Sequence, residues 1–168
     1  LLNLDPAEVG RFKGIQVWPF AVSIILFSLI IDKVGYKFSM IFAFVCQFGW
    51  AIMGYVALKI AGDNPALASD LIFWGGLVLA LGNGTVEAFI NPVVATMYDK
   101  EKTKWLNILH AGWPGGLVVA GIITILLGSA PWTLKLATIA IPAVIYFIML
   151  IKETFPVQER VAAGVSYR

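Results

Sequence analysis

The sequence predicts an all-α integral membrane protein with about five transmembrane helices. Of its 168 residues, 60% are hydrophobic and 13% are charged, and the mean hydropathy is +0.86. A soluble domain is about half apolar and carries roughly a quarter charged residues, so this composition excludes an ordinary soluble protein. The apolar runs lack the alternation of a membrane barrel, and an open sheet could not satisfy its backbone in lipid. Helices remain.

Five segments are long enough to cross the hydrocarbon core, which takes about 20 mostly apolar residues in a helix. Ser69 and Asp70 are positioned to cap the third of them, and Pro92 is expected to bend it just past Asn91. The polar segment 152–168 contains Pro156 and is expected to be a linker rather than a sixth span. The predicted spans cover residues 14–31, 38–58, 71–96, 105–127 and 134–151, all within a helical bundle over residues 1–151.

The charges between the spans predict the orientation. One side of the membrane receives eight cations and the other receives four. By the positive-inside rule, the side with eight is cytoplasmic, so the links 32–37 and 97–104 and the tail 152–168 are expected in the cytoplasm of a cell that carries the protein in its inner or plasma membrane. The eight are Lys33, Lys37, Lys100, Lys102, Lys104, Lys152, Arg160 and Arg168, and the four are Arg11, Lys13, Lys59 and Lys135.

Other features narrow the class of protein. A net charge of +2, confined to the loops, does not favour nucleic acid as a partner. Cys46 is the only cysteine, so an internal disulfide is excluded. The chain starts on the outside, has an odd number of spans and begins without methionine. We therefore expect a fragment that lacks one earlier helix.

The strongest functional signal is Glu87, the one carboxylate inside the run from Leu71 to Tyr98. Asn83, Glu87 and Asn91 follow at steps of four residues, which places them on one helix face. A charge in hydrocarbon is unfavourable by at least about 2.5–3.5 kcal/mol, so such a residue indicates a functional site. Desolvation would favour the neutral acid and make proton exchange plausible. The alternative is a structural hydrogen bond to another helix.

Polar residues also share a face of the fourth predicted span. Asn107 and His110 lie three residues apart, and Trp113 follows in the middle of the helix. His110 could face the Glu87 stripe or only pack, and Trp113 could stack on a sugar ring or only fill the bundle. His110 is the only histidine, so we expect no metal, and no cofactor motif is present. Gln16 and Gln47 could line a cavity or bond across helices.

The link between the first two spans carries a cluster of charges. Within six residues the link contains Asp32, Lys33, Gly35 and Lys37. This composition suggests a tight turn that could bind neighbouring helix ends. An ordinary basic loop would fit the charges as well. The spacing resembles the loop signature of the major facilitator superfamily, with Ser28 where a glycine is usual and Tyr36 at a commonly basic position. The resemblance implies that these four residues form a cytoplasmic gate motif.

Taken together, the segments look like the fucose-permease-like branch of that superfamily. The strongest matches are Gly84-Thr85-Val86-Glu87-Ala88-Phe89-Ile90-Asn91-Pro92 and Leu106-Asn107. The resemblance covers nearly the whole chain and implies helices two to six of a twelve-helix transporter, without helix one and the C-terminal half. It also implies that Glu87 couples transport to protons. The family's glutamine on helix five is His110 in this chain.

The resemblance implies a secondary active transporter that takes up a small polar solute, most simply a sugar, together with a proton by alternating access. The candidate substrate-binding residues are Asn83, Asn91, Asn107, His110 and Trp113. A facilitator or exporter of a nucleoside, peptide or drug on the same fold is the first alternative. An intramembrane enzyme using Glu87 and His110 is a remote one, because further reactive groups are missing, and no catalytic residue is expected. A structural or sensor subunit is the third.

Overall fold

The computed structural model describes residues 5–165, and all regular structure in this range is helical, which confirms the predicted fold class. Arg168, counted above among the tail cations, lies outside the described residues. The elements are α1 (Pro6–Gly14), α2 (Trp18–Ile60), α3 (Pro65–Met97), the short 3-10 helix η1 (Asp99–Glu101), α4 (Lys102–Leu127), α5 (Trp132–Lys152) and α6 (Glu159–Ala162).

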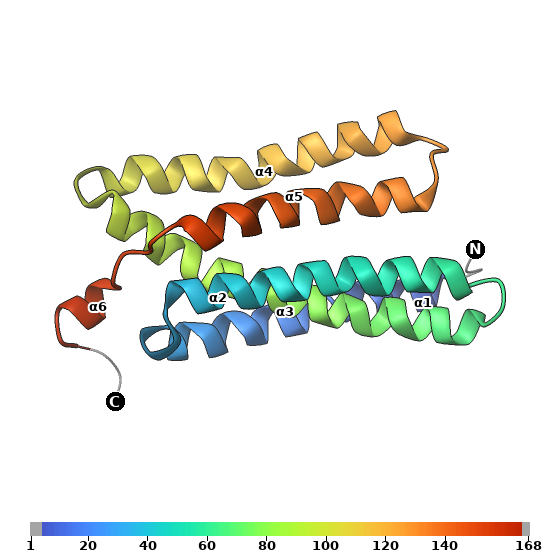
Figure 1. Cartoon of the computed structure of the whole chain (residues 1–168), viewed down its shortest axis with the longest axis horizontal. Coiled ribbons are helices and arrows are strands. Elements are labelled where there is room, and N and C mark those ends of the chain that lie inside the picture. The colour runs from blue at the N-terminus through green and yellow to red at the C-terminus, as the bar shows by residue number, and fades with distance from the viewer. Residues whose placement is uncertain (1–4, 166–168) are drawn as a thin grey trace.

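Four helical stretches in the described residues are long and apolar enough to cross a membrane. The first, Pro6–Ile60, folds back on itself at Gly35, where φ is 76° and ψ is 164°. Figure 1 shows the resulting hairpin, with α2 running to one end of the bundle and returning. We call residues 18–34 the first arm of α2 and residues 36–60 the second arm. The predicted spans 14–31 and 38–58 fall largely on these two arms, and the other three fall on α3, α4 and α5.

Two helix starts differ from the sequence-based expectation. Gly14 ends α1, and the spanning helix begins at Trp18, with Pro19 in its first turn, a position that proline suits because it lacks only a backbone donor that is unpaired there. The third span begins at Pro65 rather than Leu71. The prediction that Ser69 and Asp70 cap it is wrong, since the Asn64 side chain accepts the hydrogen bond from the Leu67 N–H at 3.1 Å.

The core of the bundle is the contact of α2 with α3, which we call the α2–α3 seam. Gly84 of α3 faces the first arm, where an added Cβ would lie 2.8 Å from Ser23 Cβ. Gly82 faces the second arm, where an added Cβ would lie 2.6 Å from Cys46 Cβ. The lack of side chains at these two positions lets α3 approach both arms closely, as small residues do in membrane bundles.

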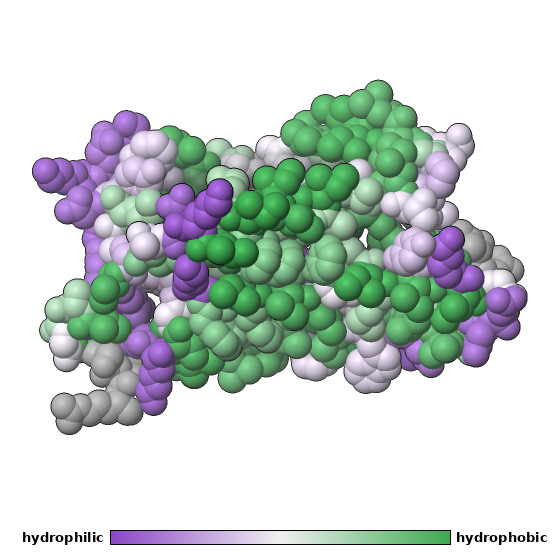
Figure 2. Space-filling view, in the orientation of Figure 1, coloured by the Kyte–Doolittle hydropathy of each residue, from purple (hydrophilic) through white to green (hydrophobic). Residues whose placement is uncertain are grey.

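The outer surface of the bundle is apolar, and its ends are polar. Figure 2 shows hydrophobic residues along the sides of the helices and hydrophilic residues gathered at the two ends. None of the residues of α4 is buried, and Leu126 near its end is 80% exposed. A surface of this composition fits lipid or a further helix rather than water. The protein is therefore a multi-pass membrane protein.

Candidate functional site

A cavity of about 660 Å³ lies between the first arm of α2, α3 and α4. Its volume falls within the range of about 300–1,000 Å³ that small-molecule sites occupy. Three of its ten lining residues are polar, and they come from two helices. Its lining consists of Phe20, Ile24, Val86, Glu87, Ile90, Asn91, Leu109, His110, Gly112 and Trp113.

Four of the residues that the sequence singles out meet in this cavity. Glu87 and Asn91 come from α3, and His110 and Trp113 come from α4. Glu87 and His110 are exposed, and the Trp113 indole is 72% exposed, so none of these side chains is committed to packing in the described residues. The Asn91 Oδ1 atom is buried without a hydrogen-bond partner. Because this atom is buried, a donor on a solute would reach it only after the Asn91 side chain rotates into the cavity.

The packing of α3 explains why Glu87 lies in the cavity. Thr85 and Phe89, on the neighbouring positions, are 0% exposed in the α2–α3 seam. Ser23 of the first arm donates to the Leu81 carbonyl at 2.7 Å, and its Oγ lies 2.9 Å from Thr85 Oγ1. Since the helix turns about 100° per residue, a face sealed at positions 85 and 89 leaves position 87 on the opposite side.

Two of the predicted substrate-binding residues do not line this cavity. Asn107 is exposed on α4, one turn before His110. Asn83 is exposed on α3, and its Oδ1 accepts a hydrogen bond from Gln47 Nε2 at 3.0 Å. Gln47 Oε1 in turn accepts from the Tyr146 hydroxyl of α5 at 2.8 Å. Gln47 therefore bonds across helices, one of the two roles that its sequence context left open.

The Gln47 and Tyr146 side chains line a second cavity of about 400 Å³ between α2, α3 and α5. Val86 lines both this cavity and the Glu87 cavity. Sequence reasoning missed Tyr146, because one phenol in an apolar span is an ordinary feature. The signal that could have found it is a polar atom deep in a helix that needs a partner.

The charged link predicted between the first two spans is a single-residue break rather than a loop. Asp32 and Lys33 still lie within the first arm, and Gly35 alone leaves helical geometry. The Lys37 ammonium donates to the carbonyls of Ile151 and Glu153 at 3.2 and 3.4 Å. A cation at the C-terminal end of a helix satisfies carbonyls that have no intrahelical donor. Lys37 thus fastens the end of α5 to the hairpin.

Asp32 and Lys33 differ from Lys37 in their surroundings. Both carboxylate oxygens of Asp32 are buried without a hydrogen-bond partner among the described residues, whereas Lys33 is exposed. The structure therefore brings only part of the predicted gate motif into contact with another element. The lone buried carboxylate favours a nearby donor or positive charge.

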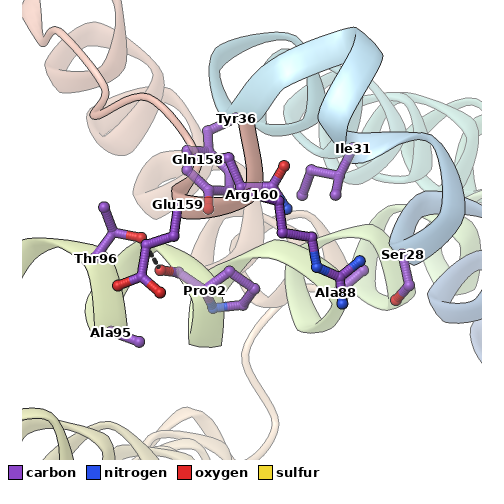
Figure 3. A pocket seen from close by; sticks show the side chains of 10 residues that line it. All are labelled: Ser28, Ile31, Tyr36, Ala88, Pro92, Ala95, Thr96, Gln158, Glu159 and Arg160. Atoms are coloured by element: carbon purple, nitrogen blue, oxygen red, sulfur yellow. Dashed lines mark hydrogen bonds between the residues drawn. The ribbon is translucent and has the colours of Figure 1, made fainter. Parts of the chain in front are cut away.

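The tail crosses the same end of the bundle. Phe155 packs against a cluster of buried residues that includes Tyr36 and Phe89, and Lys102 forms an ion pair of 2.7 Å with Glu159. A third cavity, of about 260 Å³, lies beneath α6. Figure 3 shows Gln158, Glu159 and Arg160 of the tail above Pro92 and Thr96 of α3, with Tyr36 and Ile31 of the hairpin beside them.

Within residues 5–165, no group of three or more histidine, cysteine, aspartate or glutamate side chains could hold a metal ion. The site thus consists of an acid, an amide, an imidazole and an indole around a cavity. These groups can bind a polar solute through hydrogen bonds and can exchange a proton.

Comparison with known proteins identifies the family. The model of the Major Facilitator Superfamily matches residues 1–166. No curated protein and no solved structure matches the chain. Because the family model covers almost the whole chain, and because the bundle is all-helical and apolar on its sides, the chain belongs to the major facilitator superfamily of secondary transporters.

Proposed function

We propose that the chain forms part of the N-terminal half of a twelve-helix transporter that takes up a small polar solute, with a sugar as our first hypothesis. The observation that carries the proposal is the cavity of about 660 Å³ in which Glu87, Asn91, His110 and Trp113 converge. An indole offers a flat apolar surface, and amide and imidazole groups offer donors and acceptors, which together suit a ring that carries hydroxyl groups. The unpartnered Asn91 Oδ1 is buried and would accept from a solute hydroxyl once the side chain rotates into the cavity.

Glu87 is the proposed coupling residue. It is the only carboxylate that lines the cavity, and it lies well inside a helix of 33 residues. In alternating access, two halves of a transporter rock about a midplane site. A proton on Glu87 shifts this equilibrium only if it binds the outward and inward states with different affinities. An acid that lines the cavity meets that requirement when one state admits water and the other excludes it.

The cytoplasmic side is proposed to be the end of the bundle that carries Gly35, η1 and the tail, since most of the cations gather there. The cytoplasmic gate then includes Asp32, Lys33, Gly35 and Lys37. The bonds from Lys37 to the end of α5 support a role in holding that end closed. Changes there should alter the rates of opening rather than contact with the solute.

Glu87→Gln in the complete transporter tests the coupling proposal, with uptake of D-glucose, D-galactose and L-fucose measured in proteoliposomes. The amide keeps the shape of the side chain and cannot exchange a proton. We expect the variant to lose accumulation driven by a proton gradient, while counterflow of the same sugar persists. Glu101→Gln, the same chemical change at an exposed residue of η1, is the matched control and should accumulate sugar normally. Unchanged uphill uptake by Glu87→Gln would exclude the coupling role.

A second candidate is a facilitator or exporter of a more apolar solute on the same fold, such as a nucleoside, peptide or drug. The observation in its favour is the aliphatic and aromatic majority of the lining, which includes Phe20, Ile24 and Ile90. Apolar lining with a few polar groups is typical of sites for such ligands. Counterflow of uridine, a dipeptide and a cationic dye, compared with the three sugars, separates the two candidates.

A further inference from the structure

Three polar side chains from three helices form a hydrogen-bond relay that sequence reasoning did not connect. Tyr146 of α5 bonds to Gln47 of the second arm of α2 at 2.8 Å, and Gln47 bonds to Asn83 of α3 at 3.0 Å. Apart from Thr138, the rest of the cavity around Gln47 and Tyr146 is lined by apolar residues such as Met40, Phe89 and Ile139. In such surroundings an unpaired donor or acceptor is unfavourable.

The donors and acceptors of the relay fix its direction. A phenol has one proton to donate, and among the described residues its hydrogen-bond partner is Gln47 Oε1. Thr138, the other hydroxyl side chain that lines the cavity, donates to the Lys135 carbonyl at 2.6 Å. If the Gln47 amide were reversed, the Tyr146 hydroxyl would lose Gln47 Oε1 as its acceptor and would itself accept from the Gln47 NH₂ group. In the structure Gln47 keeps its Oε1 on Tyr146 and turns its NH₂ group toward Asn83.

The orientation of the Gln47 amide determines the orientation of the Asn83 amide. A Gln47 NH₂ group can only donate, so Asn83 must turn its Oδ1 toward Gln47, as the bond of 3.0 Å records. The two N–H donors of Asn83 Nδ2 have no partner among the described residues, and Asn83 is exposed. Its position four residues before Glu87 places it on the same helix face, about 6 Å along the axis.

We propose that Gln47 and Tyr146 are positioning residues that hold the Asn83 amide with its NH₂ group toward the solute, so that the transported molecule presents a hydrogen-bond acceptor one helical turn from Glu87. The inference rests on the proposed uptake of a sugar. It specifies that a sugar oxygen accepts a hydrogen bond from the Asn83 NH₂ group. A hydroxyl that faces Asn83 accepts a hydrogen bond. A fluorine at the same carbon can still accept but cannot donate.

The test compares deoxy and deoxyfluoro analogues of one hexose in the complete transporter. The hexose is whichever of D-glucose, D-galactose and L-fucose gives the largest counterflow, and each analogue is assayed as an inhibitor of that counterflow. At one carbon, the wild type should bind the fluoro analogue about 3- to 10-fold more tightly than the deoxy analogue, as expected for one hydrogen bond. Equal binding at every carbon would overturn the proposal.

Two variants alter the relay without touching the solute. Tyr146→Phe frees the Gln47 amide to rotate, so the fluoro-to-deoxy preference should fall to about 1 to 2-fold, with KM raised and the maximal rate kept. The ionised carboxylate of Gln47→Glu can only accept, so Asn83 must donate to it and turn its Oδ1 outward, and the preference should reverse at a pH where the carboxylate is ionised. Tyr55→Phe, at an exposed tyrosine of the same arm as Gln47, is the matched control and should keep the wild-type preference. A preference that is unchanged in Tyr146→Phe would also overturn the proposal.

A second experiment does not depend on any sugar. Tyr146 and Asn83 are connected through Gln47 rather than to each other. In a double-mutant cycle of thermal unfolding with Tyr146→Phe and Asn83→Ala, the relay predicts that the two changes are coupled. Additive effects would overturn the relay. If no hexose shows counterflow in the wild type, the proposed sugar transport fails, and the cycle alone decides whether the relay exists.

Discussion

The two faces of α3 contrast sharply, although they alternate within the same turns of one helix. Gly82, Gly84 and Thr85 lie in the α2–α3 seam, where the side chains are small and the backbones approach closely. Glu87 and Asn91 lie on the other face and line a cavity. This contrast indicates that the seam stabilises the bundle and keeps the polar residues free for a solute, because a helix that is tightly packed on one side cannot rotate to hide them.

Gly84→Ala should have the largest effect on the seam. The new Cβ would lie against the backbone carbonyl oxygen of Phe20 and 2.8 Å from Ser23 Cβ, so the two helices would have to separate. We expect a loss of stability of at least about 1–3 kcal/mol, the range for overpacked cores, measured as a lower midpoint of thermal unfolding in detergent. Gly116→Ala in α4 meets nothing within 4 Å and should leave the midpoint unchanged or raise it slightly. Equal shifts in the two variants would contradict the contrast.

Ser23→Ala should weaken the seam by a smaller amount. It removes the bonds to the Leu81 carbonyl and to Thr85 Oγ1, while Thr85 keeps its own bond to the Leu81 carbonyl at 2.8 Å. We expect a loss of about 0.5–1.5 kcal/mol, as for one net hydrogen bond. Ser28→Ala, at an exposed position of the same arm, provides the reference in the same unfolding assay. A destabilisation by Ser28→Ala as large as that by Ser23→Ala would argue against a polar contact that closes the seam.

Lys102→Ala, away from both faces of α3, should have the smallest effect. Its ion pair with Glu159 is 2.7 Å long, but both side chains are about half exposed. Exposed pairs contribute about 0–1 kcal/mol and weaken as salt is added. A double-mutant cycle with Glu159→Gln, at low and high salt, measures the coupling. A coupling well above 1 kcal/mol that resists salt would instead make the tail a structural part of the bundle.

The sequence was sufficient to predict the features of the fold that depend on composition and periodicity. The long apolar runs predicted the helical membrane fold, and the four-residue spacing of Asn83, Glu87 and Asn91 predicted a shared face. Of the six residues that the sequence groups, four line the cavity and two do not, and the binding roles of all six remain predictions; the four are Glu87, Asn91, His110 and Trp113, and the two are Asn83 and Asn107. Helix starts are harder to predict, because Ser69 and Asp70 are as suited to an N-cap as Asn64, which caps the helix that begins at Pro65.

Contacts between distant parts of the chain could not be predicted in the same way. The partners of Lys37 are backbone carbonyls more than one hundred residues away, and a carbonyl carries no sequence signature. The relay of Tyr146, Gln47 and Asn83 depends on how three helices are rotated relative to one another. The periodicity of each helix by itself does not determine how that helix is rotated relative to its neighbours. Only the three-dimensional arrangement therefore reveals the pairing.

The most direct test of the central contrast is the access of water to position 87. In a Cys46→Ser background of the complete transporter, Glu87→Cys, Ala88→Cys and Ile145→Cys are labelled with a charged, membrane-impermeant thiol reagent. Ala88 is buried beside the cavity under the tail and outside the lining of the Glu87 cavity, and Ile145 is exposed on α5. Rapid labelling of Glu87→Cys, slowed by a transported sugar, with slow labelling of the other two, is the predicted result. Labelling of Glu87→Cys as slow as that of Ala88→Cys or Ile145→Cys would mean that position 87 is sealed or faces lipid, and would contradict the account.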